Sequence, residues 1–237
     1  MKTVVCAVLL ICFAVPCYGS SHKSKWKENQ NWDNYFQKEK VQGCFLLYDL
    51  QRNEYVSYNR RRVDTRFLPA STYKIFNSLV ALETGAVRDE TEVLKWDGIK
   101  RMVPAWNQDQ NMRDAIKNST VWFYQEMARR IGQARMQNYV NVAHYGNRDI
   151  GGGIDHFWLD GRLRITAKEQ IDLLVKLHRN QLPFSPRAIN IVKDILINEK
   201  TDNYTLRAKT GWAGLGDKSA PQRTLHLIVH DMNQFGK

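Results

Sequence analysis

The sequence predicts an α+β fold, in which an antiparallel sheet flanked by helices is assembled from both ends of the chain and an all-helical region is inserted between them. Strand-like segments lie near the start and near the end of the chain, and segments of helical periodicity lie between them. The chain has 237 residues, of which 43% are hydrophobic and 25% are charged. No repeat, low-complexity tract or flexible linker divides it, so we expect one compact unit.

The first regular elements are predicted as a β-hairpin and a long helix. Residues 42–58 contain two short apolar runs that flank a polar turn, which is the pattern of two paired strands. Residues 71–84 carry apolar side chains at helical spacing, Pro69 lies just upstream, and Gly85 follows the last turn. We therefore expect a helix over 71–84.

The remaining elements continue in the order helices, then strands. Helical periodicity recurs at residues 120–131, 166–179 and 186–199. Strand patterns follow at residues 204–208 and 224–229. The strands from the two ends of the chain are expected to share one sheet.

The first residues have the pattern of a secretory signal peptide. Lys2 supplies a positive charge, residues 4–15 form an uncharged apolar run, and small residues offer a cleavage site after Gly19. This run is shorter than the roughly 20 residues that a spanning helix needs, so we expect no stable membrane span. We predict a signal peptide at 1–19 and a folded domain at 20–237.

Cleavage after residue 19 removes three of the four cysteines, namely Cys6, Cys12 and Cys17. Only Cys44 then remains, so no internal disulfide is expected. A lipoprotein anchored at Cys17 is the alternative, although Val15 and Pro16 stand where small residues are usual.

The chain is basic, with a formal net charge of +11. This excess attracts anions, but its sign alone does not distinguish a nucleic acid, an anionic membrane and an acidic small substrate. Residues 60–62 are arginines, yet acids interrupt the basic residues elsewhere and no nucleic-acid motif is present, so we expect no nucleic-acid partner. His226 and His230 lack the glutamate of a metalloprotease motif, and residues 151–153 lack a P-loop lysine. We predict no metal or phosphate site there.

Ser71 and Lys74 are the first candidates for chemistry, because they open the predicted helix in an S-x-x-K pattern. Side chains three residues apart lie on the same face of a helix, so the hydroxyl and the amine meet. A serine hydroxyl becomes a strong nucleophile when a base takes its proton, and lysine is a base only when burial or a nearby cation keeps it neutral. On its own, the pattern more often marks a helix-capping serine beside a solvated lysine.

Two further motifs favour the chemical interpretation. Ser119 precedes a predicted helix, and Lys209, Thr210 and Gly211 follow a predicted strand. A glycine at that point lets a substrate backbone approach the strand closely. The combination of S-x-x-K with a later K-T-G is the signature of the serine penicillin-recognising enzymes.

From about residue 32 to residue 222 the chain resembles one family of these enzymes, the class D β-lactamases. The motifs that carry the resemblance are residues 69–77 with Tyr73 where the family usually has phenylalanine, Ser119-x-Val121, Tyr145-Gly146-Asn147, Phe157-Trp158-Leu159 and Lys209-Thr210-Gly211-Trp212. The Tyr-Gly-Asn motif and Trp158 are particular to this class. The resemblance implies a β-lactamase/transpeptidase-like fold, a transpeptidase-like catalytic domain at 20–237, a periplasmic location and a small-molecule β-lactam substrate.

The resemblance also implies how the base is made. In the family, the lysine that corresponds to Lys74 reacts with carbon dioxide to form a carbamate, which acts as the general base; no metal or other cofactor is implied. Only a neutral amine adds carbon dioxide, and an apolar pocket keeps lysine neutral. We expect Val121, Ile75 and Trp158 to form walls of that pocket, with the Trp158 indole N–H donating to the carbamate.

The other roles follow from the same resemblance. Ser71 is expected to attack the lactam carbonyl, while the backbone N–H groups of Ser71 and Trp212 hold the oxyanion. Ser119 is expected to pass a proton to the lactam nitrogen. Lys209 and Thr210 are expected to bind the substrate carboxylate.

The likeness weakens after residue 222. The family usually continues with a Gly-Trp strand, a further strand and a terminal helix, whereas residues 223–237 lack that pattern. No residue is assigned to the family's carboxylate-binding arginine, for which Arg223 is the nearest candidate, and we expect a sheet that lacks an outer pair of strands.

Two alternatives to a β-lactamase stay open: a penicillin-sensing domain that is acylated without turnover, and a catalytically incomplete relative. No sequence pattern indicates the oligomeric state.

Overall fold

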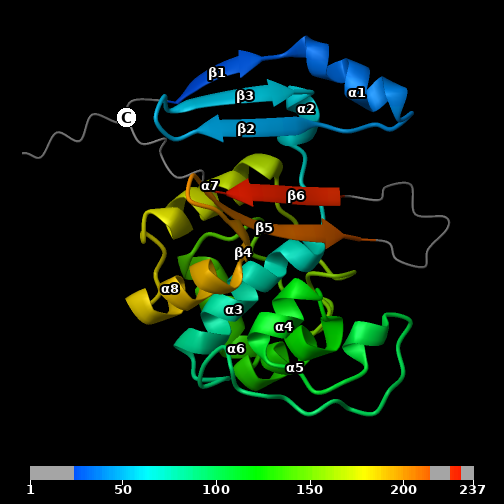
Figure 1. Cartoon of the computed structure of the whole chain (residues 1–237), viewed down its shortest axis with the longest axis vertical. Coiled ribbons are helices and arrows are strands. Elements are labelled where there is room, and N and C mark those ends of the chain that lie inside the picture. Colours follow the sequence, from blue (N-terminus) through cyan, green and yellow to red (C-terminus); the bar gives the residue numbers. More distant parts are fainter. Residues whose placement is uncertain (1–23, 214–224, 231–237) are drawn as a thin grey trace, which may run out of the picture.

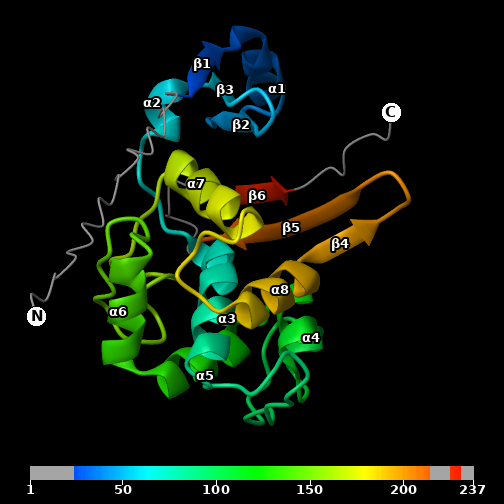
Figure 2. The same cartoon turned by 90° about the vertical axis from the view of Figure 1, so that its left-hand side faces the viewer.

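The structure is a computed structural model that describes residues 24–213 and the strand backbone at 225–230 (Figure 1). The predicted leader at 1–19 and Arg223 lie outside the described residues. One small sheet lies at one end of the molecule, a second sheet lies beneath it, and most of the helices gather at the opposite end (Figures 1 and 2).

The first sheet contains the hairpin expected within residues 42–58. Strands β2 (Phe45–Asp49) and β3 (Glu54–Tyr58) pair antiparallel. The Asp49 side chain accepts hydrogen bonds from two backbone N–H groups of the turn, which stabilises the reversal. Strand β1 (Lys25–Glu28), which the sequence did not predict, pairs parallel to the other side of β3.

The second sheet has the order β4-β5-β6, and both of its ladders are antiparallel. Its strands are β4 (Ile197–Lys200), β5 (Thr205–Trp212) and β6 (Leu225–His230). The strand predicted at 204–208 is confirmed as part of β5, but it continues through the K-T-G motif. The strand predicted at 224–229 is confirmed as β6.

The α+β class is confirmed, but the strands form two hydrogen-bonded sheets where the sequence predicted one. The edge strands β2 and β6 lie on the facing sides of the two sheets, and no ladder joins them (Figures 1 and 2). The β2–β3 and β4–β5 ladders each join strands that only four residues separate in the sequence, and short loops cost the least closure entropy. A shared sheet would need β2 and β6 to approach within about 4.8 Å.

The helix predicted at 186–199 ends earlier than expected, so its predicted C-terminal boundary is wrong. Helix α8 (Pro186–Ile195) begins as expected, with the Ser185 side chain capping its first turn and proline in that turn. The chain then turns into β4, which pairs with β5. The apolar spacing near the end of α8 suits either conformation, and the partner strand decides between them.

Helix α3 (Tyr73–Glu83) lies at the centre of the molecule, and ten of its eleven residues are buried. A 3₁₀ turn, η2 (Ala70–Thr72), precedes it, and Gly85 follows it with a φ of +67°, as expected for a residue after a helix C-terminus.

The remaining helices are α1 (Asp33–Lys38), α2 (Arg60–Val63), α4 (Met112–Lys117), α5 (Val121–Ile131), α6 (Gln133–Val142) and α7 (Ala167–His178), with 3₁₀ turns η1 (Gln30–Trp32) and η3 (Pro104–Trp106).

Helices α5 and α7 confirm the segments predicted at 120–131 and 166–179. Within residues 24–213 and 225–230, no helix is long and apolar enough to span a bilayer.

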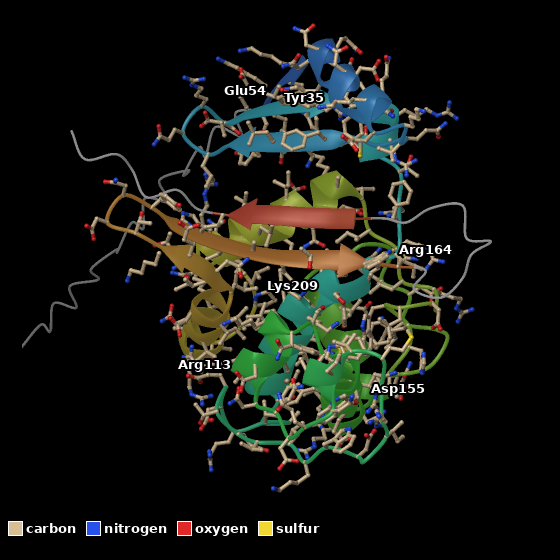
Figure 3. The ribbon with its side chains drawn as sticks, turned by 45° about the vertical axis from the view of Figure 1, so that its right-hand side comes forward. Tyr35, Glu54, Arg113, Asp155, Arg164 and Lys209 are labelled. Carbon is tan, nitrogen blue, oxygen red and sulfur yellow. The ribbon has the colours of Figure 1, made fainter. Side chains whose placement is uncertain are left out.

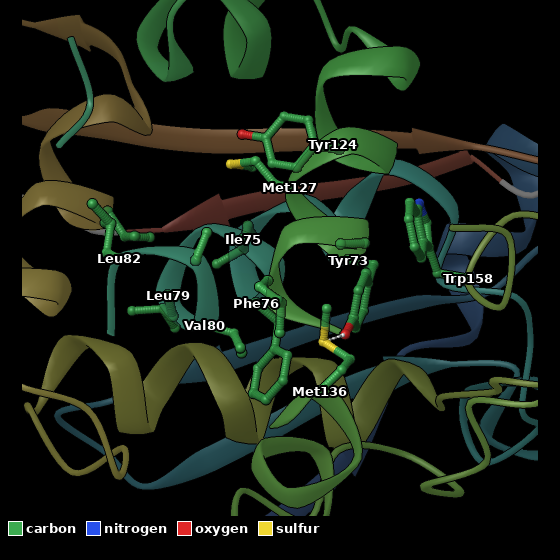
Figure 4. Close-up of a cluster of buried hydrophobic side chains, with 14 of the residues drawn as sticks. Tyr73, Ile75, Phe76, Leu79, Val80, Leu82, Tyr124, Met127, Met136 and Trp158 are labelled. Atoms are coloured by element: carbon green, nitrogen blue, oxygen red, sulfur yellow. Dashed lines mark hydrogen bonds between the residues drawn. The ribbon is translucent and has the colours of Figure 1, made fainter. Parts of the chain in front are cut away.

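Tyr73 anchors an aromatic cluster against α3 (Figure 4). Its ring stacks on Trp158 with centroids 5.3 Å apart and meets Tyr145 and Phe157 edge-on. Its hydroxyl donates to the sulfur of Met136 at 3.0 Å, so the polar atom of this tyrosine has a partner inside the core. The cluster joins α3 to the loop that carries Trp158.

Candidate active site

The chain makes a strained turn directly before Ser71. Ala70 has a φ of +47°, which a residue with a Cβ adopts rarely and at a cost of about 1–3 kcal/mol. Ala70 is fully buried, and its N–H donates to the Trp158 carbonyl at 3.0 Å. The surrounding structure therefore holds this turn, which leaves Ser71 half-buried at the entry to α3.

Ser71 and Lys74 are in direct contact. Lys74 Nζ and Ser71 Oγ lie 2.6 Å apart, and Lys74 has no exposed surface. Burial lowers the pKa of Lys74 well below that of a solvated lysine, and the nearby charge of Lys209 lowers it further. A neutral amine in this position can accept the Ser71 proton. The structure thus brings the two residues of S-x-x-K together, as their spacing predicts.

A second serine–lysine pair lies beside the first. Ser119 has a φ of +54° just before α5, and Lys209 Nζ donates to its Oγ at 3.0 Å. Lys209 projects from β5 (Figure 3), and its Nζ also donates to the Thr210 carbonyl at 2.8 Å. Burial lowers the pKa of Lys209 to about 8. Its proton is therefore held less tightly than that of an exposed lysine.

Gly211 lets β5 pack directly against the turn that carries Ser71. A Cβ at this position would lie 2.9 Å from Thr72 Cγ2 and 3.1 Å from the Pro69 carbonyl oxygen, which is too close for an ordinary contact. Substrate access was the reason predicted for this glycine, and packing against η2 is a second one. The neighbouring residues Thr210 and Trp212 are both exposed.

Trp158 is fully buried, and its indole N–H has no hydrogen-bond partner among the described residues. A buried hydrogen-bond donor without an acceptor lowers the free energy of unfolding, so the presence of this indole N–H in the core needs a reason. Ile75 is buried on α3, and Val121 is half-buried at the first position of α5. Their expected place in the walls around Lys74 stays a prediction.

Tyr124 and Ser78 also belong to this region, although the sequence did not single them out. The Tyr124 ring centroid lies 5.4 Å from Lys74 Nζ. Ser78 donates to the Lys74 carbonyl at 2.8 Å, and its hydroxyl lies 3.1 Å from that of Tyr124. The available signal was helical spacing, because Tyr124 follows Val121 by three residues on α5.

This geometry suits acyl transfer through a serine nucleophile. A hydroxyl touches a buried amine, and a second hydroxyl touches a second lysine at the end of a strand. Among the residues that the structure describes, no three His, Cys, Asp or Glu side chains are grouped to hold a metal ion. The side chains of His226 and His230 lie outside the described residues.

The comparisons with known proteins agree with this geometry. Residues 23–228 match the penicillin binding protein transpeptidase domain family. The chain is 42% identical to β-lactamase OXA-5 of Pseudomonas aeruginosa over 221 residues, which cover 93% of this chain and 81% of that protein. It is 46% identical to β-lactamase OXA-48 of Klebsiella pneumoniae over 189 residues, which cover 80% of this chain and 71% of that one.

Solved structures point to the same family. The crystal structure of the class D β-lactamase YbXI from Nostoc is similar with a TM-score of 0.82 and 46% identity, covering 87% of this chain and 85% of that one. FUS-1 (OXA-85), a class D β-lactamase from Fusobacterium nucleatum subsp. polymorphum, matches with a TM-score of 0.77 and 44% identity, covering 79% and 78% of the two chains. By these matches, and in agreement with its two serine–lysine pairs, the chain belongs to the class D β-lactamases.

Proposed function

We propose that this chain hydrolyses β-lactam antibiotics through an acyl-enzyme on Ser71, with a carbamate on Lys74 as the general base. One observation carries the proposal: Lys74 Nζ is fully buried and lies 2.6 Å from Ser71 Oγ. A hydroxyl in contact with a group that can remove its proton is the minimal unit of serine acyl transfer. Antibiotic resistance is the expected biological consequence.

The surroundings of Lys74 fit a carbamate. Burial favours the neutral amine, which is the form that adds carbon dioxide. A buried anion needs hydrogen-bond donors and positive charge; Trp158 Nε1 is a buried donor without a partner among the described residues, and Lys209 lies near enough to affect the pKa of Lys74. When present, the carbamate supplies the general base for both acylation and hydrolysis.

The other site residues act directly on the substrate. Ser71 Oγ attacks the lactam carbonyl, and the backbone N–H groups of Ser71 and Trp212 donate to the oxyanion. Ser119 donates a proton to the departing lactam nitrogen, and Lys209 replenishes it along their 3.0 Å hydrogen bond. Lys209 and the exposed Thr210 bind the substrate carboxylate. Gly211 lets the substrate backbone approach β5 closely.

The proposed location is the periplasm. The pattern at residues 1–19 supports a cleaved leader, with the catalytic domain at 20–237. The proposed partner of the mature protein is a small-molecule β-lactam. The proposed function requires no nucleic-acid partner.

Steady hydrolysis of a chromogenic cephalosporin tests the proposed function. We expect the purified chain to convert many equivalents of the substrate at a constant rate, because the same base serves acylation and deacylation. A burst of one equivalent followed by arrest would instead indicate a penicillin-sensing domain. No colour change and no covalent adduct by mass spectrometry would indicate a catalytically incomplete relative.

Trp158→Phe tests the role of the unpartnered indole N–H. The phenyl ring keeps most of the packing against Tyr73 but removes the donor, so we expect deacylation to slow by about 100-fold and acylation to change much less. Stopped-flow measurement of the two steps checks this. Trp96→Phe is the matched control, because it removes an indole N–H that donates to Ile99 in an exposed loop. Equal slowing of both steps by Trp158→Phe would mean that Trp158 only packs.

A further inference from the structure

Thr72, the residue after Ser71, is held by two elements distant in sequence. Its methyl group faces Gly211 of β5, where a Cβ would come within 2.9 Å. Its hydroxyl donates to the Pro69 carbonyl at 2.7 Å and lies 3.3 Å from the Gln170 side-chain oxygen on α7. Thr72 is 1% exposed and Gln170 is 5% exposed. A buried polar contact from α7 therefore reaches the turn of the nucleophile.

With the Gln170 amide placed in this way, its two polar atoms lack suitable hydrogen-bond partners at Thr72. A threonine hydroxyl has one proton, and Thr72 gives it to Pro69 over the shorter distance. The Gln170 side-chain oxygen then faces an oxygen that has no proton for it, while Gln170 Nε2 is buried without a partner among the described residues. Turning the amide by 180° gives Nε2 an acceptor, because it then donates to Thr72 Oγ1, while Oε1 takes the buried position that Nε2 held.

Gln170 lies in the first turn of α7, and several contacts hold this turn in place. Thr166 caps the helix, and Glu169 completes a capping box by accepting from the Thr166 N–H. Glu169 also pairs with Arg66, and Phe67 forms an antiparallel bridge with Ile165. The start of α7 is thus tied to the segment that leads into the nucleophile turn.

The turn needs such support because of its backbone. Ala70 holds a φ of +47°, and a residue in that conformation relaxes unless its neighbours prevent it. The Trp158 carbonyl restrains the N-terminal side of the turn through Ala70. Restraint on the C-terminal side comes through Thr72, so Ser71 lies between two anchored residues.

We propose that Gln170 is a positioning residue for the nucleophile: its side-chain amide donates to Thr72 Oγ1 and thereby keeps Ser71 Oγ in reach of the base at Lys74. Gln170 acts through Thr72 and not on the substrate. The inference rests on the proposed function for its kinetic consequence, but the restraint on the turn exists in the free protein.

Gln170→Glu and Gln170→Met test this role. Glutamate has nearly the same shape but, when ionised, has no proton to donate, so we expect acylation to slow about tenfold at pH 8. Protonation restores a donor, so the deficit should shrink toward pH 5.5, whereas the deficit of Gln170→Met should not change with pH. The constant for substrate binding should stay within about twofold of the parent. Gln181→Glu, at an exposed position, is the control for added charge, and each rate is compared with that of the parent at the same pH.

Hydrogen exchange separates this inference from the proposed function. Without substrate, Gln170→Met should speed amide exchange by about tenfold at residues 70–74, while the rest of α3 exchanges as in the parent. This result would support the restraint even if the parent failed to hydrolyse β-lactams. Unchanged exchange at residues 70–74 overturns the inference, as does a Gln170→Glu deficit that is the same at both pH values or that lies wholly in substrate binding.

Discussion

We expect Ser71→Ala to lower kcat/KM for β-lactams by about 10⁴-fold or more, because no acyl-enzyme forms without the hydroxyl. Ser71 Oγ touches Lys74 Nζ at 2.6 Å, so the substitution removes the nucleophile and leaves the base in place. The measurement is hydrolysis of a chromogenic cephalosporin, together with intact-protein mass spectrometry after exposure to substrate. The variant should show neither turnover nor a covalent adduct.

Ser185→Ala is the matched control for Ser71→Ala. The Ser185 side chain caps α8 by accepting from the Ala188 N–H, so its loss should cost about 1 kcal/mol of unfolding free energy. Turnover at a temperature well below Tm should stay within about twofold of the parent, since α8 carries none of the proposed catalytic residues. A covalent adduct on Ser71→Ala would identify another nucleophile and contradict the proposed mechanism.

The second expected result is that activity depends on carbon dioxide. In degassed buffer at mildly acidic pH, turnover should fall by about tenfold or more and should return when bicarbonate is added at the same pH. The sign follows from the lowered pKa of Lys74. The buried amine stays neutral to a lower pH than a solvated lysine, but it becomes protonated as the pH falls through its lowered pKa, and a protonated amine cannot add carbon dioxide.

Lys74→Met is the control for the carbon dioxide effect. It fills the buried position with an unbranched apolar side chain and should show no turnover with or without bicarbonate. A sample of the parent in ¹³C-labelled bicarbonate should give a carbamate carbon resonance that Lys74→Met lacks. Full activity of the parent in degassed acidic buffer, or the same resonance in Lys74→Met, would remove the carbamate from the mechanism.

The helices were predicted well where the sequence contains both periodicity and an end signal. Helix α7 starts after Thr166, which forms a capping box with Glu169, and α3 ends before Gly85. Both signals are local interactions between residues a few positions apart, so the sequence alone encodes them. Helix α6 (Gln133–Val142) buries only Met136 and Val140, and its weak apolar pattern gave no prediction.

The strands were predicted less well, because their partners are distant in sequence. Strand β4 was assigned to the end of a helix, and β1 was not predicted at all. The four-residue β1 forms because one edge of β3 is available for parallel pairing. The sequence of residues 25–28 contains no pattern that indicates this pairing. The division into two sheets likewise depends on which edges meet in space.

The sequence by itself determined that the Ser71 and Lys74 side chains lie on the same side of the chain, because a three-residue spacing has that consequence both in an α-helix and in a 3₁₀ turn. Only the tertiary structure decided that Lys74 is fully buried, that Ser119 meets Lys209 and that Gln170 reaches Thr72. The last two contacts join residues that are 90 and 98 positions apart in the chain. The physical reason is that local spacing sets the direction of a side chain, whereas desolvation and contact depend on packing elements that are far apart in sequence.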